Sequence, residues 1–286
     1  MNYRTHIGMT ILWGLSLSLM LAQGLSAGDA KRVPKNPFFA FDNGVGRGRW
    51  SPQQQADFLK ELGYAGIGYT GTSDLSERLR VFKSRALRVY SLYVHCYPGR
   101  EEAYPPQLVE ALEQLDGTGI MLWLTVQGKT NDEQAVRILR ELADAAAPHG
   151  VKIALYPHFG FYVATARDAL RLAKMTGRKN VGVSINLCHE LRAGNTVQLG
   201  DIIKAAASRL FLVSINGADN EGGWDKLIQP LDRGEFDVRR FLVQLKDVGY
   251  AGPIGLQCYN IKGDIRENLE RSMKAWRELS QSLDPQ

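Results

Sequence analysis

The sequence predicts an α/β protein that folds as one (β/α)8 TIM barrel. Short apolar runs alternate with amphipathic segments eight times over residues 38–282, and such alternation favours parallel strands joined by helices. The apolar runs are continuous, as is typical of strands that are covered on both faces. Eight strand–helix units in about 250 residues match a closed barrel. An open doubly wound sheet is the alternative that the same alternation allows.

The expected strands come from the apolar runs, and the expected helices lie between them. The strands cover residues 38–41, 65–69, 88–94, 119–126, 152–155, 181–185, 210–215 and 254–256. The helices cover residues 52–62, 73–84, 106–115, 132–147, 166–175, 197–207, 238–248 and 265–280. A loop of about twenty residues, 216–235, separates the seventh strand from its helix and is unusually long for such a connection.

Capping residues fix the ends of several of these helices. Ser51, followed three residues later by Gln54, has the pattern of a capping box, with proline at the first helical position. Thr165 and Asp168 repeat the pattern before the fifth helix. Gly63 and Gly177 follow helix ends, where glycine adopts the left-handed conformation most easily.

The ends of the chain are expected to lie outside the barrel. Residues 1–27 contain a short polar start, the apolar run Ile11–Leu21 and a small-residue cleavage site, which is typical of a secretory signal peptide. An uncleaved membrane anchor is the alternative, although the run is shorter than the roughly 20 residues of a spanning helix. Residues 28–37 form a linker, residues 38–282 the barrel and residues 283–286 a tail. We therefore expect a secreted or periplasmic protein that is not stably inserted in a membrane after cleavage.

Charge and cysteine content argue against two other classes of protein. The net charge is +5 without a dense Lys/Arg stripe, so we expect no nucleic-acid partner. The three cysteines, Cys96, Cys188 and Cys258, are odd in number and widely spaced, which does not indicate a disulfide framework. We expect them to be packed thiols.

Polar side chains directly follow the last four predicted strands. In a barrel of this type the carboxyl ends of all strands meet on one face, which carries the active site. Amides, imidazoles and phenols predominate there, and they suit a hydroxylated ligand because amides both donate and accept and aromatic faces pack against sugar rings. The residues expected to contact a small carbohydrate are Tyr156, Asn186, Asn216, Asp219, Gln257, Tyr259, Lys262, His95 and Trp224.

Some of these side chains have a candidate chemical role. His158 and His189 are the candidates for proton transfer because imidazole titrates near neutral pH. A structural or ligand-orienting role is the alternative for each histidine. Lys262 either stabilises an anionic group or lies on the surface. Trp224, in the long loop 216–235, either stacks over a sugar ring or packs within its loop.

The order of elements and these strand-end motifs resemble the xylose isomerase-like TIM barrel family, which includes sugar phosphate isomerases and epimerases and an endonuclease IV branch. The resemblance covers nearly all of residues 38–282 and is clearest in residues 153–158, 186–189, 213–219 and 252–264. It implies an isomerase, an epimerase or a lyase of carbohydrate metabolism. In the metal-dependent members, Glu, Asp, His and Glu at the ends of strands five to eight hold a divalent ion.

The sequence departs from that family pattern at all four metal-ligand positions. These positions hold Tyr156, Asn186, Ser214 and Gln257, while the nearby family histidine is retained as His189. Asn216 or Asp219 is the alternative to Ser214 at the seventh strand. Mg²⁺ and Mn²⁺ prefer hard, anionic oxygen ligands, and all three carboxylates are replaced. We therefore expect no metal cofactor in the family position. A zinc or manganese ion held in another way, for example by His158, His189 and Asp219, is the alternative.

These observations predict an exported, carbohydrate-acting barrel that moves a proton next to a carbonyl without a metal ion, with His158 or His189 as the base. A non-catalytic carbohydrate-binding barrel that has lost its metal site is the alternative. DNA repair, as in the endonuclease IV branch, requires a cluster of zinc ligands that this pattern lacks. The sequence leaves the sugar and the oligomeric state open.

Overall fold

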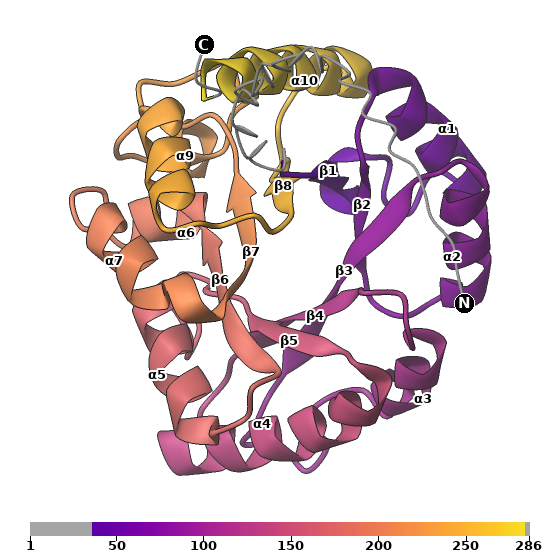
Figure 1. Ribbon diagram of the computed structural model, residues 1–286, viewed down its shortest axis with the longest axis vertical. Coiled ribbons are helices and arrows are strands. Elements are labelled where there is room, and N and C mark those ends of the chain that lie inside the picture. The colour runs from indigo at the N-terminus through magenta and orange to yellow at the C-terminus, as the bar shows by residue number, and fades with distance from the viewer. Residues whose placement is uncertain (1–35, 284–286) are drawn as a thin grey trace, which may run out of the picture. The chain divides into compact units, whose positions relative to one another are not determined.

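The strands of this chain form a closed parallel barrel (Figure 1). The computed structural model describes residues 36–283, so the predicted signal peptide and most of the predicted linker and tail lie outside the described residues. Each strand pairs in parallel with the next, and β1 pairs with β8, with Phe38 opposite Ile254. The barrel prediction is confirmed, and the open doubly wound sheet is wrong. The strands are β1 (Phe38–Phe41), β2 (Gly66–Thr70), β3 (Arg88–Cys96), β4 (Met121–Val126), β5 (Lys152–Leu155), β6 (Val181–Asn186), β7 (Leu210–Ile215) and β8 (Ile254–Leu256).

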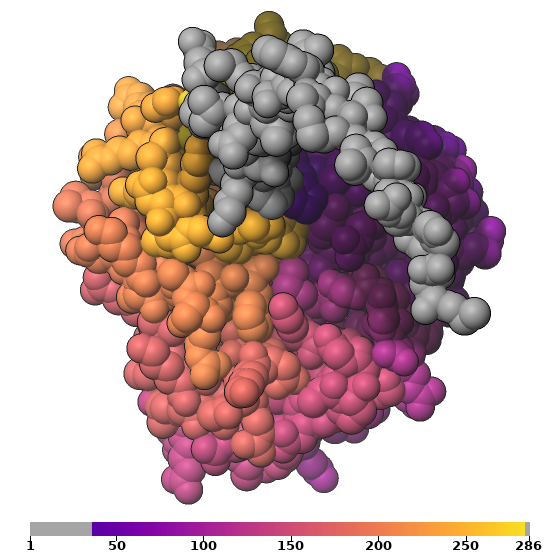
Figure 2. All heavy atoms as spheres, viewed as in Figure 1, coloured from indigo at the N-terminus to yellow at the C-terminus, as the bar shows by residue number. Residues whose placement is uncertain are grey.

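Helices surround this barrel, and successive segments follow one another around it in chain order (Figures 1 and 2). None of the helices within residues 36–283 combines the length and the apolar character that crossing a membrane requires. The α-helices are α1 (Pro52–Leu62), α2 (Leu75–Ser84), α3 (Gln107–Gln114), α4 (Asp132–Ala146), α5 (Ala166–Thr176), α6 (Leu187–Arg192), α7 (Leu199–Ala206), α8 (Trp224–Leu227), α9 (Val238–Asp247) and α10 (Ile265–Ser282), and the 3-10 helices are η1 (Asp42–Gly44), η2 (Ala147–His149) and η3 (Ala207–Arg209).

The predicted capping residues have the expected geometry. The Ser51 side chain accepts a hydrogen bond from the backbone N–H of Gln54, and the Gln54 side chain accepts one from the Ser51 backbone N–H. Thr165 and Asp168 form the same reciprocal pair at the start of α5. Gly63 ends α1 with φ of 87°, a conformation that costs little only for glycine. Local sequence therefore determines where these helices begin and end.

Two short helices were not expected from the sequence. Helix α6 begins directly after β6, where the pattern indicated only polar residues at a strand end. It forms because Leu187 and Leu191, one helical turn apart, are both buried. Helix α8 lies within the long loop 216–235 and is only four residues long. Both helices carry residues that line the cavity described below.

Aromatic rings fill the inside of the barrel below its carboxyl-terminal face. The Phe41 ring stacks on Trp123 with centroids 4.3 Å apart, and Trp123 stacks on Tyr156 at 3.8 Å. The neighbouring strands β2 and β8 accommodate these rings with glycine. A Cβ atom on Gly68 or Gly255 would come within 2.4 or 2.5 Å of the Phe41 ring. The stack thus requires small residues on both sides of β1.

The three cysteines are free and buried, as predicted. Burial raises the pKa of Cys96 and of Cys258 to about 12. A thiol with such a pKa carries almost no thiolate at neutral pH, so these side chains act as packing groups.

Removing one of the interior rings should destabilise the barrel. Phe39 is fully buried and stacks on Tyr90 at 4.8 Å, so we expect Phe39→Ala to lower the free energy of unfolding by about 3–5 kcal/mol. Urea unfolding followed by circular dichroism measures this loss. Phe159→Ala, the same change at a residue that is 39% exposed, is the control and should cost less than about 1 kcal/mol. Equal losses in the two variants would contradict the assigned interior packing.

Candidate functional site

A cavity of ≈ 640 Å³ lies at the carboxyl ends of the barrel strands. Aromatic, imidazole and amide side chains dominate its lining, as is usual for a site that binds small polar molecules. The lining residues are Phe41, Asp42, Asn43, Arg47, Thr70, Tyr93, His95, Trp123, Tyr156, His158, His189, Trp224, Ile228, Gln257, Tyr259 and Asn260.

The structure brings most of the residues selected from the sequence to this cavity. Trp224 reaches it from α8 in the long loop, and its ring lies 5.1 Å from that of His189. Tyr259, which is 60% exposed, lies on the lining as well. The selected residues that line the cavity are Tyr156, His158, His189, Gln257, Tyr259, His95 and Trp224.

Four selected residues do not line the cavity. Asn216 is buried, and its Nδ2 donates to the carbonyls of Gly217 and Leu227 at 2.7 Å each, so it holds the loop that follows β7. Asp219 accepts from the backbone N–H of Glu235 at 3.3 Å, so it holds the far end of that same loop. These contacts are local, and strand-end position alone did not reveal them.

Lys262 and Asn186 also differ from the expectation. Lys262 is exposed and does not line the cavity, but it donates to Oδ1 of the lining residue Asn260 at 2.8 Å. Asn186 is fully buried, and its Oδ1 accepts from the Cys188 thiol at 3.3 Å. Asn186 therefore supports lining residues rather than facing a ligand directly.

The backbone of Phe159 assigns opposite tautomers to the two candidate histidines. The Phe159 carbonyl lies 3.1 Å from His158 Nδ1, and a carbonyl only accepts, so His158 carries its proton on Nδ1. The Phe159 N–H lies 3.1 Å from His189 Nδ1, and an N–H only donates, so His189 Nδ1 is unprotonated. Neutral His158 therefore has its acceptor lone pair on Nε2, and neutral His189 has its hydrogen there.

Burial keeps both rings neutral. The pKa of His158 lies below its ordinary value of 6.5, chiefly because of burial. The pKa of His189 lies well below it, because this ring is buried more deeply and faces His158, whose centroid is 4.1 Å away. His189 Nε2 lies 3.2 Å from the Tyr156 hydroxyl. Both nitrogens of His189 are thus engaged within the protein, whereas no hydrogen bond within residues 36–283 uses His158 Nε2.

Tyr156 is the buried centre of this group. Burial raises the pKa of its hydroxyl well above the ordinary value of 10, with smaller opposing contributions from the nearby Asn186 and Gln257 side chains. Because His189 Nε2 donates to the hydroxyl oxygen, the phenol hydrogen is left to donate elsewhere. Tyr156 is therefore a neutral hydrogen-bond donor in the cavity lining.

His95 is held in the lining by β4 and the residue that follows it. Its Nδ1 lies 2.8 Å from the Gln127 amide nitrogen and 3.0 Å from the Thr125 hydroxyl. Burial lowers the pKa of His95 as well. With Nδ1 accepting from the amide, the neutral ring has its hydrogen on Nε2.

Nine of the lining residues were not among the predicted ligand contacts. Asp42 and Asn43 directly follow the first predicted strand, and that position is the signal that points to them. Phe41 and Thr70 are the last residues of β1 and β2, and the others come from strand interiors or from later in their loops. Those nine residues are Phe41, Asp42, Asn43, Arg47, Thr70, Tyr93, Trp123, Ile228 and Asn260.

The four family metal-ligand positions hold groups that fit a divalent ion poorly. Tyr156 and Gln257 line the cavity, while Asn186 and Ser214 lie opposite each other on β6 and β7 and are fully buried. Asn186 Nδ2 has no hydrogen-bond partner within the described residues, and such a donor cannot bind a cation. Nowhere in residues 36–283 do three or more His, Cys, Asp or Glu side chains come together in a way that suits a metal ion.

Comparison with known proteins identifies several relatives. An inosose isomerase of Halalkalibacterium halodurans is 28% identical over 131 residues, which are 43% of this chain and 45% of that enzyme. The chain spans about half the length of the curated relatives it matches.

Solved structures share the fold over most of the barrel. The crystal structure of the IolI protein with a bound zinc atom superposes with a TM-score of 0.72 at 18% identity, covering 87% of this chain and 100% of that one. A D-allulose 3-epimerase of Methylomonas sp. in complex with D-allulose gives a TM-score of 0.71 at 18% identity, covering 86% and 97%.

The family profile matches a larger share of this chain than the curated relatives do. The sequence profile of the xylose isomerase-like TIM barrel matches residues 56–279, from α1 into α10. This range includes every barrel strand except β1. The chain therefore belongs to the xylose isomerase-like TIM barrel family.

Proposed function

We propose that this protein acts on a carbohydrate or a closely related polyol and transfers a proton at the carbon next to a carbonyl, as isomerases and epimerases do. The observation that carries the proposal is the pairing of an unprotonated His158 Nε2 with the neutral Tyr156 hydroxyl in one cavity lining. The likeness to inosose isomerases and to a D-allulose 3-epimerase supports a carbohydrate as the substrate class.

His158 is the better placed of the two predicted bases. A base needs an unprotonated atom that is free to approach the substrate, and Nε2 of His158 meets this condition. To accept a proton, His189 would have to lose the bond that its Nδ1 accepts from the Phe159 N–H. We therefore assign proton transfer to His158 and the positioning of Tyr156 to His189.

The proposed reaction has two steps, the removal of a proton and its return. His158 Nε2 takes the proton from the carbon next to the carbonyl, and the C–H electron pair forms the C=C bond of an enediol(ate). The carbonyl π electrons move to its oxygen, where the Tyr156 hydroxyl donates a hydrogen bond or its proton. Return of the proton to the other face of the first carbon, as the original oxygen gives up any proton it received and re-forms the carbonyl, gives the epimer. Return of the proton to the former carbonyl carbon, as the hydroxyl on the first carbon loses its proton and becomes the new carbonyl, gives the isomer.

The second part of the proposal is that no divalent ion occupies the family position. The donor groups there carry no formal negative charge, whereas hard divalent ions require anionic oxygen ligands. In their place the phenol hydroxyl, held by His189, donates to the substrate oxygen that a cation would otherwise polarise. The IolI structure contains a bound zinc atom, so a bound metal ion is the alternative for this protein. A metal analysis of the purified protein distinguishes the two.

We also propose that the protein is exported. The polar start, apolar run and small-residue site within residues 1–27 support a secreted or periplasmic location.

Replacing His158 should abolish proton transfer. With a panel of keto- and aldo-sugars in D₂O, we expect wild-type protein to exchange a carbon-bound proton and His158→Gln to slow this exchange by about 10²–10⁴-fold. Because burial lowers the pKa of His158, the rate should be constant from neutral pH upward and fall only below pH 6.5. NMR measures the exchange, and His149→Gln, in η2, is the matched control. Binding without exchange by wild-type protein would favour the non-catalytic alternative.

The two tautomers predict distinct nitrogen spectra. In protein labelled with ¹⁵N-histidine, His158 should show a protonated Nδ1 and an unprotonated Nε2, and His189 the reverse. Long-range ¹H–¹⁵N NMR resolves the two nitrogens, and the His158→Gln spectrum assigns the signals. Tyr156→Phe should speed solvent exchange of the His189 Nε2 hydrogen, since it removes the acceptor. The same tautomer in both rings would contradict the assignment.

Removing metal should leave the activity unchanged. We expect the deuterium exchange rate to be the same before and after dialysis against a chelator, because the donor groups at the family position are uncharged. Elemental analysis of the purified protein should find no stoichiometric Mn, Zn or Co. The metal-independent part of the proposal fails if one such ion is present at one per chain and its removal and re-addition switch the exchange off and on.

A further inference from the structure

We infer that the substrate carries an acidic group and that Arg47 binds it. This inference rests on the proposed function and narrows its substrate class to sugar acids or other sugars with an oxyanion. Arg47 lies in the turn after β1, lines the same cavity as His158 and Tyr156, and was not selected from the sequence.

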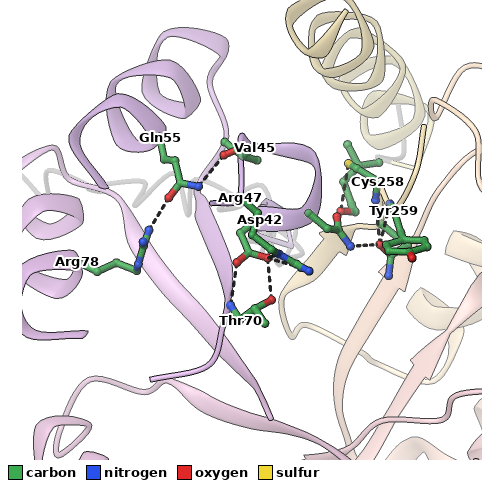
Figure 3. Close-up of polar contacts among 11 residues, drawn as sticks. Asp42, Val45, Arg47, Gln55, Thr70, Arg78, Cys258 and Tyr259 are labelled. Atoms are coloured by element: carbon green, nitrogen blue, oxygen red, sulfur yellow. Dashed lines mark hydrogen bonds and ion pairs between the residues drawn. The ribbon is translucent and has the colours of Figure 1, made fainter. Parts of the chain in front are cut away.

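The buried carboxylate of Asp42 fixes the orientation of Arg47 (Figure 3). Asp42 is 1% exposed, and its Oδ1 accepts from Arg47 Nε at 3.0 Å and from Arg47 Nη2 at 2.6 Å. Thr70 donates to the same carboxylate through its hydroxyl and through its backbone N–H, at 2.9 Å each. Because Thr70 shares the carboxylate, Arg47 is not the only group that compensates the buried charge.

The guanidinium keeps one edge free for a second anion. A guanidinium has five N–H donors, and Asp42 engages the edge formed by Nε and one hydrogen of Nη2. The other edge, formed by Nη1 and the second Nη2 hydrogen, makes no hydrogen bond within the described residues. The Arg47 side chain is 40% exposed and lines the cavity, so a ligand in the cavity can reach the guanidinium. Two parallel N–H donors match the two oxygens of a carboxylate or a phosphate.

Among the described lining residues, one carboxylate and one cation carry a permanent charge, and the cation keeps a hydrogen-bonding edge for a ligand. The carboxylate is Asp42, and its oxygens are occupied by Arg47 and Thr70. The three lining histidines have pKa values lowered by burial, so they add no positive charge at neutral pH. Lys262, for which the sequence left an anion-binding role and a surface position open, is exposed, donates to Asn260 Oδ1 and does not line the cavity. Among the described residues that line the cavity, Arg47 is thus the one permanently charged cation.

The test compares neutral sugars with their acidic counterparts. Isothermal titration measures the binding of glucose, galactose and mannose, of the three matching uronates, and of the three matching 6-phosphates. We expect at least one acid to bind about tenfold or more tightly than its neutral partner, because a hydrogen-bonded ion pair is lost without the acid. This advantage should disappear in Arg47→Gln and shrink as salt is raised.

Two further variants keep the test interpretable. Arg47→Gln leaves Asp42 without its cation, so the double variant Asp42→Asn/Arg47→Gln removes both charges and should lose the same advantage while remaining folded. Arg49→Gln, two residues later and outside the cavity lining, should retain it.

The outcomes separate this inference from the proposed function. A preference for uronates identifies a carboxylate, and a preference for phosphates identifies a phosphate; either supports the Arg47 site. If neutral sugars bind or exchange deuterium and no acid binds more tightly, or the advantage persists in Arg47→Gln, this inference is overturned and the proposed function stands. If no sugar of either kind binds or exchanges, both are overturned.

Discussion

The pairing of β1 with β8 is the contact on which the rest of this structure depends. It closes the sheet, with Phe38 opposite Ile254 and Ala40 opposite Leu256. Closure brings the residues that follow β1 next to those that follow β8, although more than 200 positions separate them in the chain. It also encloses the aromatic stack that starts at Phe41 and ends at Tyr156. The cavity lies above that stack, so its floor is as rigid as the barrel core.

Tyr156 belongs both to the barrel core and to the lining of the cavity. Its ring belongs to the interior stack, and its hydroxyl meets His189, Asn186 and Gln257. Three of the four residues predicted at the family's metal-ligand positions, Tyr156, Asn186 and Gln257, therefore meet at one phenol hydroxyl. The proposed reaction needs a donor toward a developing oxyanion, and a neutral phenol held by a histidine provides one without a change in fold.

The sequence predicted the fold well because barrel periodicity and helix caps are local signals. The eight strands, the capping boxes at Ser51 and Thr165, and the polar residues at strand ends all follow from neighbouring residues. The site was predicted less completely, because side-chain partners are set by packing. Asn216 has the same strand-end position as the lining residue Gln257, yet its amide is used to hold its own loop.

The sequence by itself determined the class of this protein, a (β/α)8 barrel with polar groups at the ends of its strands. Only the tertiary structure decided which hydrogen bonds those groups make. The Phe159 backbone forms a hydrogen bond with His158 and another with His189, and so gives the two rings opposite tautomers. The spacing of the two histidines in the sequence does not predict this. Likewise, Arg47 is held in the cavity lining because it donates to the buried carboxylate of Asp42, which also accepts from Thr70 at the end of the neighbouring strand. Hydrogen bonding in a closed core depends on three-dimensional neighbours, and those exist only after the barrel closes.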